Sequence, residues 1–304
     1  MILGMGRAAV MGERRVTGLS DEVIGDLVAE LGPVWQARQQ ARLSARTRQR
    51  ALGAGAKHRL VFVDRLLATL VHLRHATTHD VLAAWFSVDR STITRAIGEI
   101  RPLLADRGCR ISAGRRLATL AEVVDYLGAH GGEAILDATE IRVRRPAVGR
   151  VDRDRFISGK TKQNAIKAMV LTDRDGRMLF CGATRAGSCA DITQARQAGL
   201  VDLLQHTPAP AILADAGYQG LGAQTGGRII TPPHRKFRKN PPAWYEQHYA
   251  CQRKSHSSRR IRVEHGIAHL KNWKALTRHH GRRETLDDTI RAVAGLLSDH
   301  QRTR

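Results

Sequence analysis

Three acidic residues, far apart in the chain, stand where a carboxylate could do chemistry. Asp137 lies in the apolar stretch 134–143, in which β-branched residues alternate with charged ones, as is typical of a buried strand. Asp215 ends a second apolar strand and precedes a glycine turn, and Glu264 lies in the helical pattern of 257–275. A buried carboxylate is costly unless it binds a partner, and hard oxygen ligands suit Mg²⁺ or Mn²⁺.

The net charge of the chain points to a polyanionic partner. The 304 residues include 50 Lys and Arg against 28 Asp and Glu, which gives a formal net charge of +22. The sequence pI is near 11.1. An excess of this size favours nucleic acid as the partner over a generally basic protein without one. Hydrophobic residues make up 42% of the chain, enough for one large domain with a core and a smaller domain.

Cysteine usage and hydropathy exclude several classes of protein. The four cysteines have no C-x-x-C spacing, so they predict neither a disulfide framework nor a zinc ribbon. No apolar stretch reaches the roughly 18 residues that a membrane span needs, and the N-terminal stretch lacks the charged-then-apolar order of a secretory signal. We therefore expect a protein of a reducing bacterial cytoplasm, associated with the nucleoid.

Two helical patterns with a tight turn between them lie in the first half of the chain. Residues 80–86 predict a short helix, 87–89 a turn, and a second helix begins at Arg90. This is a helix-turn-helix pattern, in which the start of the second helix contacts DNA. An ordinary helical hairpin fits the spacing equally well, and the net charge favours DNA binding. The side chains that would contact DNA are Arg90, Ser91, Thr92, Thr94 and Arg95.

The flanking patterns suggest how the chain is divided. Residues 21–31 predict a helix that stops near Pro33, and 34–50 predict a second helix whose basic side could face solvent or a phosphate backbone. Residues 101–116 are expected to form a basic connector. The resulting segments are an N-terminal helical segment (1–56), a helix-turn-helix DNA-binding domain (57–130) and a catalytic α/β domain (131–304).

The catalytic segment is predicted to begin with three antiparallel strands joined by loops. The strand patterns cover 134–143, 165–171 and 178–184. A helix then runs from Asp191 to about Gln205, and we expect Asp191 to be its N-terminal cap, or more weakly to support the site.

Basic residues surround the three acids. The stretch 158–162 invites comparison with a phosphate-binding P-loop, but the position that needs the first glycine holds Asp154, which excludes the motif. Lys160 and Lys162 remain as candidate DNA contacts. Across 231–283 there are 14 Lys and Arg and two acids, so Glu264 is either a structural ion pair or a catalytic group that faces a polyanion.

The predicted order of elements matches a ribonuclease H-like α/β fold, a mixed sheet flanked by helices, preceded here by an all-α helix-turn-helix domain. In that order the first Asp lies in mid-strand, the second follows the fourth strand, and the Glu lies on a late helix. From about residue 58 to 300 the chain resembles DDE-type transposases of the insertion-sequence and harbinger-like groups. The motifs that carry this resemblance are Leu136-Asp137-Ala138-Thr139, Gly187-Ser188 with Asp191, Ala214-Asp215-Ala216-Gly217-Tyr218, and Arg260-x3-Glu264-x6-Lys271, with Ser257 where the family signature has Tyr.

The resemblance implies a metal-dependent endonuclease that cleaves the ends of an insertion element and joins them to target DNA. Asp137, Asp215 and Glu264 would hold two Mg²⁺ or Mn²⁺ ions, roughly 3.5–4 Å apart. Arg260 and Lys271 would contact DNA phosphates. The helix-turn-helix would bind the terminal inverted repeats, and because two ends must meet, a homodimer or larger assembly on DNA is expected.

Other interpretations of the same residues were weighed. His265 and His269 are four residues apart on the helix of Glu264, but the order is not His-Glu-x2-His, so the metalloprotease motif is absent. Three unrelated structural acids would also give this pattern. Two alternative functions remain: a DNA-binding regulator built on a degenerate nuclease domain, and a metal-dependent endonuclease that cuts without joining.

Overall fold

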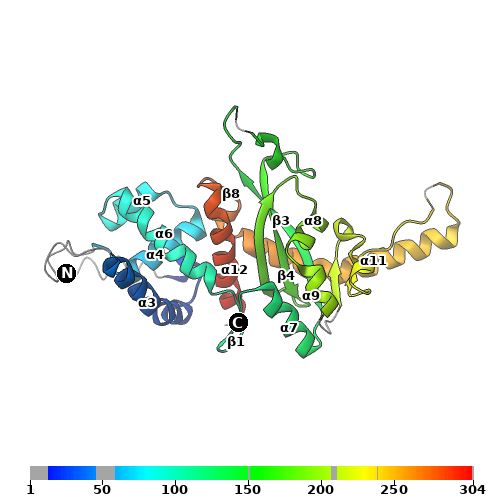
Figure 1. Cartoon of the computed structure of the whole chain (residues 1–304), viewed down its shortest axis with the longest axis horizontal. Coiled ribbons are helices and arrows are strands. Elements are labelled where there is room, and N and C mark those ends of the chain that lie inside the picture. Colours follow the sequence, from blue (N-terminus) through cyan, green and yellow to red (C-terminus); the bar gives the residue numbers. More distant parts are fainter. Residues whose placement is uncertain (1–12, 46–58, 150, 207–210, 238, 303–304) are drawn as a thin grey trace.

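The structure is a computed structural model, and it describes residues 13–45, 59–149, 151–206, 211–237 and 239–302. Helices of the N-terminal half form one group, and a mixed sheet covered by helices forms the other, with α12 between them (Figure 1). In the first group the helices are α2 (Arg14–Thr17), α3 (Asp21–Ser44), α4 (Phe62–His75), α5 (His79–Phe86) and α6 (Arg90–Asp106). Among the described residues no helix is long and apolar enough to cross a bilayer.

The sheet has the strand order of a ribonuclease H-like fold, which confirms the predicted fold class. Its order is β5-β4-β3-β6-β7; β3 to β5 pair antiparallel, and β6 and β7 continue it in parallel to β3. A short strand, β8, also pairs with β3. The strands are β3 (Ala134–Val143), β4 (Ala165–Asp173), β5 (Met178–Ala186), β6 (Ile212–Ala214), β7 (Ile229–Ile230) and β8 (Arg278–His279).

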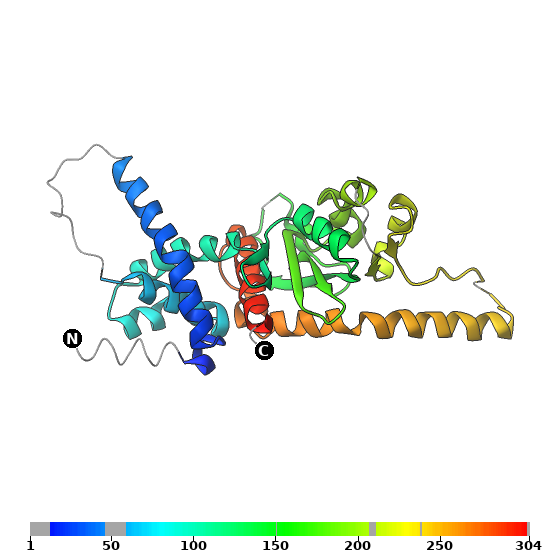
Figure 2. The same cartoon turned by 90° about the horizontal axis from the view of Figure 1, so that it is seen from below.

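Helices cover both faces of this sheet (Figure 2). Alternate residues of β3 divide between two cores: Leu136 packs with the cluster of α7, α8 and α9, whereas Ile141 belongs to the cluster that contains α12. Because successive side chains of a strand point to opposite faces, α7, α8 and α9 cover one face of the sheet and α12 covers the other. The helices are α7 (Leu120–His130), α8 (Asp191–Gln197), α9 (Leu200–His206), α10 (Leu221–Gln224), α11 (Ala243–Lys271) and α12 (Leu286–Arg302).

The helix-turn-helix is formed by α5 and α6, as predicted. The Thr78 hydroxyl accepts a hydrogen bond from the Val81 N–H and caps α5. Ser87, in the left-handed region at φ 54°, ends α5, and α6 begins at Arg90. The small core includes Leu67, Leu82 and Ala83 with Ile93, Ala96 and Ile97 of α6.

Four predicted local features were wrong. Residues 21–44 form one helix through Pro33, because Trp35 beyond the proline packs on Phe62 and so continues the buried side of α3. The expected connector 101–116 is the end of α6 followed by a hairpin, β1 (Cys109–Ser112) and β2 (Arg115–Leu117). The helix after Asp191 breaks at Gly199, whose φ is +77°. The helix predicted over 257–275 begins 14 residues earlier, at Ala243, and ends at Lys271.

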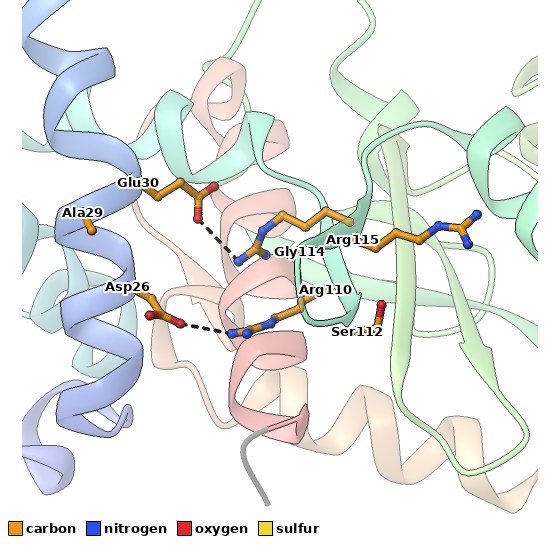
Figure 3. A pocket seen from close by; sticks show the side chains of 8 residues that line it. Asp26, Ala29, Glu30, Arg110, Ser112, Gly114 and Arg115 are labelled. Atoms are coloured by element: carbon orange, nitrogen blue, oxygen red, sulfur yellow. Dashed lines mark hydrogen bonds and ion pairs between the residues drawn. The ribbon is translucent and has the colours of Figure 1, made fainter.

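A network of ion pairs joins the two groups of helices. Asp299 of α12 is 1% exposed and pairs with Arg107 at 2.8 Å and Arg116 at 2.7 Å. Arg107 also pairs with Glu30 of α3 at 2.7 Å. Figure 3 shows the open pocket of about 550 Å³ beside this network, between α3 and the hairpin. Its acids, Asp26 and Glu30, are already paired with arginines, so we interpret this region as structural.

Two predicted segment boundaries stay predictions. The boundary at residue 56 lies outside the described residues. Near residue 130, α7 contacts α9 and β5 and contributes Val123 and Leu127 to the sheet core.

Candidate active site

Strand pairing places Asp137 and Asp215 next to each other. Leu136 of β3 and Ala214 of β6 are partners in a parallel ladder, so the residue that follows each of them lies at the same edge. Beyond that point β6 ends and Asp215 begins a turn, whereas β3 continues. The carboxylates of Asp137, in the middle of β3, and Asp215, directly after β6, therefore lie side by side where β6 ends.

Asp137 is held in a low-dielectric environment. Its burial raises the pKa of the carboxyl to about 6, while the Ala138 N–H and Arg260 act to lower the pKa and the charges of Asp215 and Asp191 raise it further. Oδ1 accepts from the Ala138 N–H at 2.8 Å, and Oδ2 accepts from the Arg260 guanidinium at 3.2 Å. A raised carboxyl pKa beside other carboxylates is typical of a site that gains a cation.

Asp191 lies beside Asp215, with the backbone of Gly217 between the two carboxylates. Asp215 Oδ1 accepts from the Gly217 N–H at 2.8 Å. A Cβ on Gly217 would lie 2.9 Å from Asp191 Oδ2 and 3.0 Å from Asp215 Oδ1, so only glycine fits between the two carboxylates. We expected Asp191 to cap its helix, but the cap position is Ala190 and Asp191 makes no capping bond. The Gly-Ser-x2-Asp spacing was the only sequence signal for its place in the site.

A buried lysine connects Asp191 with β3. Lys167, 9% exposed, lies 3.1 Å from Asp191 Oδ1 and 3.6 Å from Glu140 Oε1. Glu140 also accepts from the Ser158 hydroxyl at 2.7 Å and from the Thr161 hydroxyl at 3.1 Å.

This connection fixes a basic loop beside the carboxylates. The Ser158 hydroxyl accepts from the Lys160 and Thr161 N–H groups, each at 3.1 Å, so the loop is held in one turn. Lys160 and Lys162 are exposed on it. The sequence identified the two lysines and missed Glu140 and Lys167, whose partners become neighbours only in the folded sheet.

We name the place beside the end of β6 where Asp137, Asp191 and Asp215 lie the carboxylate edge. A stripe of charged side chains on α11 crosses it. Arg260, Glu264 and Lys271 recur at intervals that place them on one side of a helix. Burial lowers the pKa of Lys271, and the charges of Glu140 and Asp137 counter this effect. Glu264 is exposed on that stripe. In the described part of the chain no three His, Cys, Asp or Glu side chains gather closely enough to hold a metal ion.

Buried polar groups without partners lie around the carboxylates. The Tyr218 hydroxyl is buried, and burial, followed by the charges of Asp191, Asp137 and Asp215, raises its pKa well above the ordinary value. The Thr139 hydroxyl, on the same strand as Asp137, also lacks a protein partner among the described residues. Hard oxygen donors with unsatisfied hydroxyls beside them fit a hydrated divalent cation.

The predicted DNA-contacting residues of α6 share one exposed face. Arg90, Ser91, Thr94 and Arg95 are exposed, and Thr92 is half-buried beside the buried Ile93. The Thr94 hydroxyl lies 2.9 Å from His79 Nδ1, which connects α6 with α5. Arg90 pairs with Asp80 at 3.3 Å.

Known proteins with similar sequences agree with this architecture. Residues 136–298 match the family described as DDE superfamily endonuclease, and residues 58–110 match the helix-turn-helix of that superfamily. A putative transposase for insertion sequence element IS112 from Streptomyces albus G is 28% identical over 231 residues, which cover 74% of this chain and 75% of the relative.

A solved structure, the Mos1 strand transfer complex, aligns over 76% of this chain and 80% of its own, with 12% identity and a TM-score of 0.19. The resemblance to DDE-type transposases of the insertion-sequence group is confirmed by the family matches. The chain belongs to the DDE superfamily endonucleases, with the helix-turn-helix of that superfamily ahead of the catalytic fold.

Proposed function

We propose that this protein cleaves the ends of an insertion element and joins the freed 3′-hydroxyl to target DNA. The observation that carries the proposal is that Asp137 and Asp215 lie side by side at the carboxylate edge. The charged stripe of α11 crosses this place, and its Arg260 pairs with Asp137. Membership of the DDE endonucleases supports DNA cleavage. Strand transfer and recognition of terminal inverted repeats are the finer parts of the proposal.

Asp137, Asp215 and Glu264 would hold divalent cations, Mg²⁺ or Mn²⁺, two in number. When bound, these ions would supply an activated oxygen nucleophile and stabilise charge on the leaving oxygen. Glu264 lies on the α11 stripe one turn after Arg260, which donates to Asp137, and a change of its side-chain rotamer would have to bring it to the same carboxylates.

The basic side chains would position the DNA backbone. Arg260 now neutralises Asp137, and a DNA phosphate would compete for the same guanidinium. Lys271 would contact the phosphate on the other side of Glu264, and Lys160 and Lys162 would bind the strand along the loop that Glu140 holds. Positioning and charge stabilisation account for most catalysis in phosphoryl transfer.

The helix-turn-helix would bind the terminal inverted repeats through Arg90, Ser91, Thr92, Thr94 and Arg95. Since two element ends have to be brought together, we propose a homodimer or larger assembly on DNA.

A strand-transfer assay tests the proposal. Duplex ends taken from the DNA that flanks the gene are incubated with the protein and Mg²⁺, with Asp137→Asn as the control that retains the fold. Cleavage followed by joining supports the transposase; cleavage without joining indicates an endonuclease alone. Sequence-specific binding without cleavage, by a protein in which Asp137→Asn changes nothing, would indicate the DNA-binding regulator.

A further inference from the structure

The first half of α11 extends away from the body of the protein. In Figure 2 the helix continues past the sheet, and the chain from β7 runs out to its tip. No residue from 246 to 255 is buried, and His256, whose Nε2 lies 3.2 Å from the Ile230 carbonyl, is the first along this stretch that packs on the body. We name residues 232–255 the arm.

The arm is long enough to follow DNA. From Ala243 to His256 a helix rises about 20 Å at 1.5 Å per residue, which corresponds to about six base pairs at 3.4 Å each. A helix without an apolar face against a core gains little from packing, and isolated helices of this length are only marginally stable in water. Among the residues that the structure describes, the helical part of the arm therefore packs against no core.

An aromatic cluster stabilises the tip of the arm. Tyr245 is buried by its own neighbours: Phe237 meets it edge-on at 4.9 Å, Trp244 at 6.0 Å, and Tyr249 stacks on it at 5.9 Å. The Tyr245 hydroxyl accepts from the Lys236 N–H at 2.7 Å, which ties the outgoing chain to the helix. Trp244 nevertheless remains 66% exposed. A rigid base thus presents a large, open aromatic face.

Two arginines lie against the aromatic cluster at Tyr249. Arg235 and Arg253 each lie 5.8 Å from the Tyr249 ring. The sequence of the arm has six Lys and Arg against one acid, Glu246, and that acid is already paired with Arg235. Exposed aromatic rings between cations suit the backbone of duplex DNA, where cations bind phosphates and rings contact sugars.

We propose that the arm binds duplex DNA outside the cleavage point, about one arm's length from the carboxylate edge. A second copy of this chain is a poorer occupant, because its 50 Lys and Arg outnumber its 28 Asp and Glu and its net charge of +22 repels a basic surface. This inference rests on the proposed function for the position of the DNA, but its test needs no cleavage.

Binding of duplexes of two lengths tests the arm. Fluorescence anisotropy is measured in EDTA, so that no strand is cut, with a short duplex that ends at the cleavage point and a longer one that extends beyond it. The double variant Arg253→Gln/Lys254→Gln keeps the aromatic cluster and should lower the salt slope for the long duplex by about 2, from two lost phosphate contacts. Trp244→Ala should weaken binding of the long duplex about threefold, from one lost contact with the sugar–phosphate backbone. The short duplex should respond to neither change.

Arg174→Gln is the matched control, since Arg174 is an exposed arginine in the turn between β4 and β5. Equal losses from Arg174→Gln and the arm variants, or no loss on the long duplex, would overturn the proposal. So would a loss of self-association in sedimentation without any change in DNA affinity, because the arm would then bind another copy.

An exposed thiol provides an independent readout. Cys251 is exposed within the arm, whereas Cys109 and Cys181 are buried and Cys189 is half-buried, so the labelling is done in a Cys189→Ser background. A photo-crosslinker attached at Cys251 should label the flank of the long duplex and leave the short one unlabelled, with Cys251→Ser as the background control. Labelling of both duplexes alike would contradict the arm's placement. A protein that fails to cut DNA would refute the proposed function and still give these binding results.

Discussion

The helix-turn-helix and the carboxylate edge differ in how complete they are in the single chain. The α5–α6 pair has its caps, its turn and a closed core, and its DNA-contacting face is exposed. At the carboxylate edge, by contrast, the acids are neutralised by the protein's own cations: Arg260 pairs with Asp137, and Lys167 with Asp191. The first region is ready to bind, whereas the second has to exchange ion pairs before it can do chemistry.

This difference has an electrostatic cause. Carboxylates gathered at a sheet edge repel one another, and burial adds a further cost, so each is stabilised by a nearby cation in the absence of a metal. Arginine and lysine serve for this because the same groups can move to phosphates when DNA arrives. Solvent-facing Arg95 and Thr94 carry no such cost.

The largest expected effect decides whether Glu264 or Asp191 is the third acid that acts with Asp137 and Asp215. If Glu264 is the metal ligand that we propose, Glu264→Gln should lower cleavage at least about 1,000-fold. Asp191→Asn should lower it only about tenfold, since that carboxylate is already engaged by Lys167 at 3.1 Å. Single-turnover cleavage at saturating DNA measures both. The reverse order would make Asp191 the ligand and Glu264 a surface acid.

The next effect concerns pH and stability. Burial, countered by the Thr77 carbonyl, lowers the pKa of His72 in α4 from 6.5 to about 4. A histidine with a depressed folded pKa contributes stability that is complete above pH 6.5 and is lost as the pH falls toward 4. We expect wild-type protein to lose about 2 kcal/mol between pH 7 and pH 5 from this group, at about 1.4 kcal/mol per pKa unit.

His72→Gln keeps a donor for the Thr77 carbonyl and should flatten this pH dependence in urea unfolding. Asp137 should change the free energy of unfolding in the opposite direction. Its folded pKa is raised to about 6, so the folded state gains a proton before the unfolded state does, and stability rises as the pH falls below 6. An unchanged pH profile in the variant would show that His72 titrates normally.

Sequence reasoning succeeded where a pattern is local or where strand ends meet. The start of α6 at Arg90, the place of Asp137 within β3 and that of Asp215 directly after β6 were all predicted, because each depends on neighbouring residues or on strand order. The continuous α3 through Pro33 was missed, because a tertiary contact between Trp35 and Phe62 overrides the local signal.

The rest of the site could not be predicted, for physical reasons. Lys167 and Glu140 look like ordinary surface residues of an alternating strand, and only their register across β3 and β4 makes them partners. The helical first half of α11 was missed because its sequence lacks an apolar stripe that periodicity could detect.

A smaller effect tests the binding region. Arg95→Ala should weaken binding to the element's end about tenfold and lower the salt slope by about 1 if the guanidinium contacts a phosphate. Cleavage of DNA already bound at saturation should hardly change, because the carboxylate edge is not involved. Anisotropy over a range of salt concentrations, with single-turnover cleavage in parallel, measures both. Unaltered affinity and slope would place the recognition helix elsewhere.

The smallest effect comes from an ion pair at the start of that helix. Arg90 pairs with Asp80 at 3.3 Å, and both side chains are largely exposed, at 68% and 71%. An exposed pair of this kind contributes at most about 1 kcal/mol to stability, so Asp80→Asn should leave the unfolding midpoint nearly unchanged. Because the variant frees the Arg90 guanidinium and removes a negative charge from the DNA-facing side, affinity for DNA should rise about two- to threefold, chiefly through the association rate at low salt. A decrease in affinity would show that the pair holds Arg90 in its binding geometry, and the helix-turn-helix would then depend on its ion pairs as the carboxylate edge does.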